Sequence, residues 1–497
     1  MYRTIGFFAA TMFLAIAIVA PAQADLAPPK KLNPEEASRD VRLLTRALTE
    51  LHPGLTKYQT ELEWRAALAH FEARGNAART VTELYLAASE LAAAVRCGHT
   101  WTNILNQQGA IKSSLLESAD KVPFMMTLVE GRWLVLASVD ARLKKGDEIV
   151  AVNGISAGEM VKMIWPYLRA DGSSNNKRFR QLGHDRFDYS QMDIIWPLLS
   201  PPANGSYQIS ARRDEGTQQT FNIQAISMAA RKAALATQGI APKSEQWAFH
   251  IEGKVATMQL PTFSFWNSKF DWEGFLSNSF AELNTKKIAN LIIDIRENEG
   301  GDGAIGARII AYLLKQPYRY TSNQSVTNYE RVPYNLVRYL DTWDYSFFDR
   351  TGKVTKITTG PQAGKLEFMP RVFGERVVTP HPDPYPGKVY LLIGGENSSA
   401  TFQFAWLAQK AGVATLVGQA TGGNLRGLSG SELTWVTLPN SGVSVDIPLL
   451  ATRYQFDTPD ASVMPDVVVR RSFDLQKRGR DEELEAVHAL IAKRDGR

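Results

Sequence analysis

The sequence is poor in cysteine: Cys97 is the only one among 497 residues. A single thiol cannot form an internal disulfide, so the stability of the folded chain must come from its apolar core. No group of histidines and cysteines has the spacing of a zinc site, so we expect no metal and no cofactor.

A dense run of lysine and arginine is also missing, although the formal net charge is +5. Such runs mark nucleic-acid-binding surfaces, so we expect no nucleic-acid partner. Hydrophobic residues make up 44% of the chain and charged residues 22%, as in soluble globular proteins. The length is too great for one ordinary core and predicts roughly two to four domains.

The one long apolar run lies at the N-terminus. It follows Arg3, is short, and ends at the small-residue site Ala22-Gln23-Ala24. This pattern predicts a bacterial secretory signal peptide, residues 1–24, and a mature protein that is exported to the periplasm or secreted. No later stretch is long and apolar enough to cross a membrane, so we expect no stable membrane insertion after cleavage.

Residues 25–118 have apolar positions at helical spacing, and Asn33 is a suitable residue to cap the first helix. The last helix of this region runs toward Gly98 and His99. We expect it to end there, because glycine tolerates the left-handed conformation of a helix C-cap.

Residues 119–230 change to short β-type runs. The strand of residues 148–152 is followed by the tight-turn pair Asn153-Gly154 and then by a helix, an order that resembles part of a PDZ domain. Another small β-barrel with the same turn is the alternative. PDZ domains capture extended peptides as an added strand, so this region either binds substrate or only gates the site.

Residues 235–475 return to an α/β pattern. The apolar strand 291–295 leads through a glycine-rich turn into a helix, and the strand 389–393 leads through "GGENSSA" into another. This order is typical of βαβ units with a buried parallel sheet. The aromatic insert 315–388 is predicted to be a lid, a binding wall or a packing element. Residues 476–497 are expected to form a C-terminal helix.

Two adjacent serines stand where the second strand turns into its helix. Ser398 or Ser399 could cap the helix, or one could be a nucleophile at the carboxyl edge of the sheet, where ligands bind in open α/β folds. Gly300 and Gly301 follow the first strand, where their N–H groups could approach a substrate closely. No Lys-Ser/Thr pair follows these glycines, which excludes a phosphate-binding P-loop.

These elements together resemble the S41 family of serine peptidases, which includes C-terminal processing proteases, tricorn core proteases and IRBP modules. The resemblance covers roughly residues 90–470 and is densest at 289–302 and 389–424. It implies a multi-domain α/β protein with a helical N-terminal region, a PDZ-like β domain and a ClpP/crotonase-like catalytic domain. It also implies a serine endopeptidase acting on protein or peptide substrates.

The resemblance also implies roles for residues. Ser399 matches the family's nucleophile, and Ser398 is then a turn residue. The lysine base of the C-terminal processing branch would fall at Asn424, so the Ser-Lys mechanism is absent and the histidine-using branch remains. In that branch the base corresponds to His99, whose unperturbed pKa suits this task.

The remaining catalytic roles follow the logic of a Ser-His-acid site. The family's acid corresponds to Asp457 or, less well, to Asp460. The N–H groups of Gly300 or Gly301, with that of Ala400, would stabilise the oxyanion.

Three rival interpretations stay open at this point. His99 could be a structural histidine, and the protein a non-catalytic ligand-binding module such as IRBP. The catalytic domain could instead belong to an acyl-CoA enzyme of the crotonase fold, although an export signal argues against that. A Cys97-His99 dyad is the third rival. The meeting of Ser399, His99 and an acid in space would distinguish an enzyme from the ligand-binding module.

Overall fold

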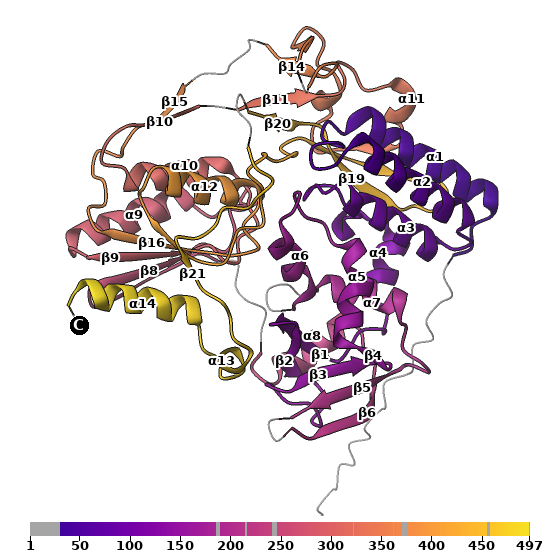
Figure 1. Cartoon of the computed structure of the whole chain (residues 1–497), viewed down its shortest axis with the longest axis horizontal. Coiled ribbons are helices and arrows are strands. Elements are labelled where there is room, and N and C mark those ends of the chain that lie inside the picture. Colours follow the sequence, from indigo (N-terminus) through magenta and orange to yellow (C-terminus); the bar gives the residue numbers. More distant parts are fainter. Residues whose placement is uncertain are drawn as a thin grey trace, which may run out of the picture.

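The structure is a computed structural model, shown in Figure 1. It describes residues 30–184, 189–213, 216–240, 246–321, 323–360, 362–369, 375–454 and 458–496. The predicted signal peptide lies outside these residues. Within them, no helix combines the length and the apolar character needed to span a membrane.

The N-terminal region is helical, as predicted. Its elements are α1 (Pro34–Leu51), α2 (Glu61–Ala77), α3 (Val81–Ala94), the 3₁₀ turn η1 (Ile104–Asn106) and α4 (Gly109–Leu116). The first three helices each begin with a capping box, at Asn33, Thr60 and Thr80, in which the side chain accepts the N–H three residues on. The predicted cap at Asn33 is therefore confirmed.

Helix α3 ends earlier than its sequence predicted. Its last residue is Ala94, and the left-handed conformation after it is adopted by Arg96, with φ +56°, and not by Gly98. The expected capping role of Gly98 is therefore wrong. A Cβ on Gly98 would lie 3.1 Å from Asp171 Oδ2, so a close approach between two loops explains the glycine at this position.

The next region is an antiparallel sheet with helices beside it. Its strands are β1 (Phe124–Val129), β2 (Arg132–Ser138), β3 (Glu148–Val152), β4 (Ile155–Ser156), β5 (Ser206–Arg212) and β6 (Gln218–Gln224). They pair in the order β1-β2-β3-β5-β6, with β4 on β3. The predicted turn at Asn153-Gly154 joins β3 to β4, and both residues have positive φ.

Helical elements lie between and after these strands. They are α5 (Ala157–Ile164), the 3₁₀ turn η2 (Trp165–Tyr167), α6 (Asn175–Leu182), α7 (Gln191–Leu199) and α8 (Met228–Ala236). Helix α6 lies between this sheet and the region that carries the second sheet (Figure 1).

The third region is built on a second six-stranded sheet of order β21-β17-β16-β9-β8-β7. Its strands are β7 (Ala248–Glu252), β8 (Val255–Gln259), β9 (Asn290–Asp294), β16 (Lys388–Ile393), β17 (Thr415–Gly418) and β21 (Val467–Val468). Only β7 runs antiparallel to its neighbour. The apolar strands predicted for a buried parallel sheet, β9 and β16, lie side by side at its centre.

Helices cover this sheet on both faces. On one side lie α9 (Trp272–Thr285), α10 (Gly303–Leu313) and α12 (Ser399–Lys410), and on the other lies α14 (Glu482–Arg494) (Figure 1). The short α13 (Phe473–Lys477) precedes α14. The units β9-α10-β16 and β16-α12-β17 confirm the predicted βαβ order, and they bring both candidate turns to the carboxyl ends of neighbouring strands.

The aromatic insert is more regular than its sequence suggested. It contains β10 (Tyr318–Thr321), β11 (Gln324–Thr327), α11 (Tyr334–Val337), β12 (Leu340–Asp341), η3 (Tyr345–Phe348), β13 (Val354–Lys356), β14 (Leu366–Phe368) and β15 (Glu375–Val378). Some of these strands pair with β18 (Leu433–Thr437) and β20 (Ala451–Arg453), and β18 also pairs with β19 (Ser444–Pro448). Buried side chains of the insert and of β18–β19 share one core with the N-terminal helices.

Candidate active site

The turn after β16 holds Ser399 in an unusual backbone conformation. Ser399 is the first residue of α12 and has φ +50°, in the left-handed region that residues other than glycine rarely occupy. Holding such a conformation costs on the order of 1–3 kcal/mol, and strain of this kind clusters at functional sites. The Ser399 side chain is half-buried, and its hydroxyl forms no hydrogen bond with any described residue.

Ser398, by contrast, is engaged. It occupies the N-cap position of α12, but its side chain does not cap the helix. Its buried hydroxyl donates a hydrogen bond to the backbone carbonyl of Glu299, at 3.0 Å. Of the two serines, Ser399 is therefore the one with a hydroxyl free to react.

The glycine-rich turn after β9 packs directly against Ser399. Gly300 has φ +134°, and a Cβ built on it would lie 2.8 Å from the Cβ of Ser399. Only glycine tolerates both conditions. Two asparagines support the two turns: Asn298 Oδ1 accepts the Gly300 N–H at 2.9 Å, and Asn397 Nδ2 donates to the Asn298 carbonyl at 3.0 Å.

The predicted oxyanion donors differ in availability. Ala400 lies in the first turn of α12, where N–H groups have no partner within the helix and the helix dipole favours negative charge. The Gly300 N–H is committed to Asn298, so it could serve an oxyanion only if Asn298 released it. Gly301 forms a parallel bridge with Phe263, in which its neighbours make the hydrogen bonds. Ala400 is thus the best placed of the three.

His99 lies in the loop that follows α3. The side chain is half-buried, and its Nδ1 is fully buried without a hydrogen-bond partner. Burial lowers the pKa of His99 below its ordinary value, and the nearby Asp171 carboxylate opposes that shift. A neutral imidazole at neutral pH is the form that can accept a proton.

No hydrogen bond joins the His99 ring to Ser399 among the described residues. The two loops are nevertheless linked through Arg169, which donates to the Gly98 carbonyl and, at 2.8 Å, to Glu299 Oε1. Glu299 in turn accepts the Ser398 hydroxyl on its backbone carbonyl. The structure therefore joins the segments that carry the predicted base and nucleophile, while their direct contact stays a prediction.

A buried ion-pair network supports the nucleophile turn from α6. Lys177, whose side chain is 1% exposed, lies 2.8 Å from Glu299 Oε1 and 2.8 Å from Glu396 Oε1. Sequence reasoning missed all three residues, because nothing near Lys177 in the sequence marks it as buried. Since two carboxylates engage its ammonium group, we assign this lysine a structural role.

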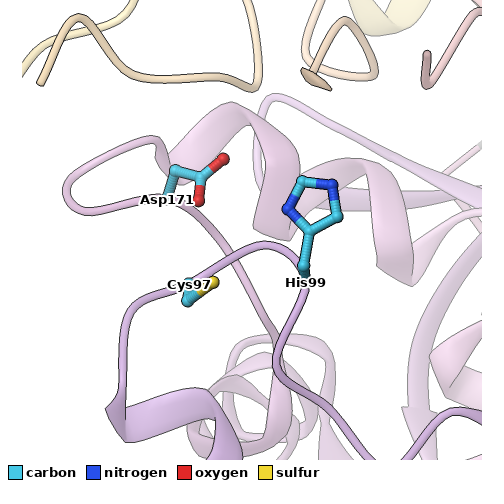
Figure 2. A group of neighbouring side chains, drawn as sticks. All are labelled: Cys97, His99 and Asp171. Atoms are coloured by element: carbon cyan, nitrogen blue, oxygen red, sulfur yellow. The ribbon is translucent and has the colours of Figure 1, made fainter. Parts of the chain in front are cut away.

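Asp171 is a further residue that sequence reasoning missed. Its Oδ1 accepts the Gly98 N–H at 2.8 Å, and its Oδ2 is buried without a partner. Figure 2 shows the carboxyl group facing the His99 ring, which turns a nitrogen toward it. One donor atom each from Asp171, His99 and Cys97 lie within 4.8 Å of one another.

Cys97 is the third member of this cluster. The thiol is buried, and burial raises its pKa to about 12, so it is protonated at neutral pH. A protonated thiol is a poor nucleophile, which argues against a Cys97-His99 dyad. We therefore interpret the cluster as a histidine-carboxylate pair beside an inert thiol.

The two predicted acids have different outcomes. Asp457 lies outside the described residues. Asp460 is described, and its Oδ1 accepts hydrogen bonds from the Ser173 N–H at 2.9 Å and from Asn424 Nδ2 at 2.7 Å. Asp460 therefore anchors the loop that follows Asp171.

The PDZ-like region contributes to the site, because Arg169, Asp171 and Lys177 all belong to it. Its outer strand β1 is partly covered by the same chain. The Met126 carbonyl accepts the His184 N–H at 2.9 Å, and the Met126 N–H donates to His184 Nδ1 at 3.3 Å. His184 Nε2 is fixed in turn by Asp193 at 3.1 Å. A peptide could add to β1 here only by displacing His184.

The aromatic insert lines a cavity of about 360 Å³ beside α12. Tyr318 and Tyr320 of the insert form one wall, and Trp406 and Leu407 of α12 face them. The insert therefore lines a cavity, as a binding wall would, and its role in binding stays a prediction.

Known proteins resemble this chain both in sequence, over part of its length, and in structure. Residues 254–469 match the model of peptidase family S41. The structure is similar to that of mature CPAF complexed with lactacystin, with a TM-score of 0.64 and 14% identity over 93% of this chain and 98% of that chain. For a second structure of mature CPAF the TM-score is 0.63 and the identity 15%, over 93% of this chain and 97% of that chain. At this identity the likeness confirms the α/β multi-domain fold. No curated protein matches the chain.

Proposed function

Because the chain is a serine peptidase of family S41, we propose that it is an exported endopeptidase that uses Ser399 as its nucleophile and His99 as its general base. Its substrates are proteins or peptides, as the family implies. The export rests on the signal-peptide pattern of residues 1–24.

One observation carries the assignment of the nucleophile. Ser399 has φ +50° at the carboxyl edge of the parallel sheet, with a hydroxyl that is not engaged, while the neighbouring Ser398 donates to Glu299. A helix cap would not need this strained conformation. An exposed nucleophile at a tight strand-to-helix turn gains from it, because the turn directs the hydroxyl outward.

The chemistry follows from these positions. Ser399 Oγ attacks the peptide carbonyl carbon while His99 removes the hydroxyl proton, and the Ala400 N–H stabilises the oxyanion that forms. The imidazolium then protonates the leaving amine, and the acyl-enzyme remains. Water, deprotonated by His99, hydrolyses the ester and restores Ser399. Hydrogen bonds of this kind tighten when substrate binds, which accounts for the absent contact between ring and hydroxyl.

A second candidate is a non-catalytic ligand-binding module on the same fold. The observation that favours it is the missing hydrogen bond between His99 and Ser399. It predicts no turnover of any peptide and no effect of changing Ser399 on ligand binding.

The test compares two adjacent serines. Ser399→Ala should abolish cleavage of an unstructured protein such as casein, whereas Ser398→Ala should keep most of it. Removing a catalytic serine lowers kcat by on the order of 10⁶. Loss of activity only in Ser398→Ala, or full activity in Ser399→Ala, would overturn the assignment.

A further inference from the structure

We propose that Asp171 is the positioning acid of this site. Its carboxylate accepts the Nδ1 proton of His99 and thereby turns Nε2 toward Ser399. This inference rests on the proposed function, but it concerns a residue outside the sequence motifs and differs from the predicted acids Asp457 and Asp460.

The first observation is a matched pair of unsatisfied atoms. His99 Nδ1 and Asp171 Oδ2 are both buried and both lack a hydrogen-bond partner. Buried polar groups without partners are rare, since each one costs free energy. The two groups face one another in Figure 2, and a single proton shared between them would satisfy both.

The second observation is that Asp171 is held rigidly. Its Oδ1 accepts the Gly98 N–H at 2.8 Å, one residue before the histidine that it would orient. The following residue, Gly172, donates its N–H to the Arg96 carbonyl at 2.9 Å. Two hydrogen bonds thus fix the Asp171 loop to the chain that immediately precedes His99.

The surrounding charges favour Asp171 over Glu299 as the partner of His99. Glu299 also lies near His99, but its carboxylate is bound by Arg169 and Lys177. The charged and titratable groups that act on His99 are Asp171, Arg169, Glu299, Lys177 and His52. Lys57 and Arg178 also interact electrostatically with Asp171.

The arrangement has a clear catalytic consequence. A carboxylate on Nδ1 fixes the tautomer in which Nε2 carries the lone pair, and it stabilises the imidazolium that forms during acyl transfer. An asparagine amide in place of the Asp171 carboxylate can hold His99 in the wrong tautomer, with the proton on Nε2. In an established Ser-His-Asp site this change lowers kcat by about 10⁴.

The decisive experiment titrates the His99 imidazole by NMR in the Ser399→Ala protein, with and without Asp171→Asn. The imidazole pKa should fall when the negative charge is removed, because the carboxylate favours the charged ring. Asp474→Asn, at an exposed aspartate of α13, is the matched control and should leave this pKa unchanged. In the active protein, Asp171→Asn should lower kcat by about 10²- to 10⁴-fold with little change in KM, whereas Asp474→Asn should not.

Two results would overturn the proposal. One is an unchanged His99 pKa in Asp171→Asn, and the other is a fall in this pKa with Asp457→Asn alone. If Asp171→Asn does not fold, a downfield Nδ1 proton of His99 in the Ser399→Ala protein supports the pair, and its absence contradicts it. These readouts need no turnover, so they remain valid if Ser399 proves not to be the nucleophile.

Discussion

The two halves of the site are built in different ways. The nucleophile half lies on neighbouring strands, β9 and β16, whose turns are joined by Asn298 and Asn397. The base half is assembled from loops of different regions: His99 follows an N-terminal helix, whereas Arg169 and Asp171 come from the PDZ-like region. The first half is therefore fixed by one sheet, and the second depends on how the regions are packed together.

Because of this difference, we expect changes in the reaction and changes in the packing between regions to have separate causes. A change at the nucleophile turn should alter the reaction and leave the packing between regions intact. A change in the buried ion pairs that join α6 to the sheet should alter both. The following predictions test that separation.

The largest effect is expected at the base. His99→Ala should lower kcat by about as much as loss of the serine, on the order of 10⁶, because nucleophile and base act as one unit. The double variant with Ser399→Ala should be no worse than either single variant. Losses that add up in the double variant, measured as kcat on one peptide, would show that the residues act independently.

The next effect concerns assembly. Lys177→Met leaves Glu299 and Glu396 without their shared cation, and breaking a buried ion pair typically costs about 3–5 kcal/mol. Urea unfolding in a Ser399→Ala background measures this free energy without self-digestion. Lys162→Met is the matched control, because its pair with Glu159 is exposed, and it should change stability by less than about 0.5 kcal/mol. Equal stability of the two variants would contradict the network's role.

A smaller effect is expected at Gly300. Gly300→Ala places a methyl group against Ser399 and forces alanine into φ +134°. Displacing the nucleophile by about 1 Å can cost roughly 10²-fold in rate, so kcat should fall by that order. Gly303→Ala, where a Cβ meets nothing within 4 Å, should keep full activity. Wild-type kcat in Gly300→Ala would mean that the contact is not needed.

The pH dependence of activity gives a finer test of the base. Imidazolium cannot accept a proton, so kcat/KM rises as pH increases through the pKa of His99. Burial lowers that pKa, so the acid limb of the profile should lie below the ordinary value of 6.5. An acid limb with an apparent pKa above 6.5 would show that the surroundings raise the pKa of His99 and do not lower it.

The smallest effect is expected at the PDZ-like sheet. Because His184 occupies the β1 edge at Met126, short apolar peptides with a free carboxyl end should not bind there measurably. Fluorescence anisotropy with the Ser399→Ala protein measures such binding. Peptide-induced loss of the Met126 amide contact, seen by hydrogen exchange, would contradict this and indicate a displaceable edge.

Sequence patterns predicted the local half of the architecture well. The apolar runs of β9 and β16, the turn at Asn153-Gly154 and the serine turn were visible because each is encoded by consecutive residues. Family S41 followed from the same motifs. The end of α3 was wrong because Gly98 serves a contact with Asp171, seventy-three residues away, and not a cap.

Long-range contacts explain the rest. No local pattern shows that Lys177 is buried between Glu299 and Glu396, or that Asp171 faces His99, because these pairs arise only when separate regions pack. The motifs placed the catalytic side chains in residues 25–118 and 235–475. They gave residues 119–230 only a substrate-binding or gating role, so Arg169, Asp171 and Lys177 were not predicted.

Labelling with a fluorophosphonate tests the central claim most directly. Trypsin releases residues 389–410 as one peptide that contains both serines, and fragmentation locates the adduct. The account predicts an adduct on Ser399, none on Ser398, and a labelling rate that collapses in His99→Ala. An adduct on another residue, or an unchanged rate without His99, would contradict it.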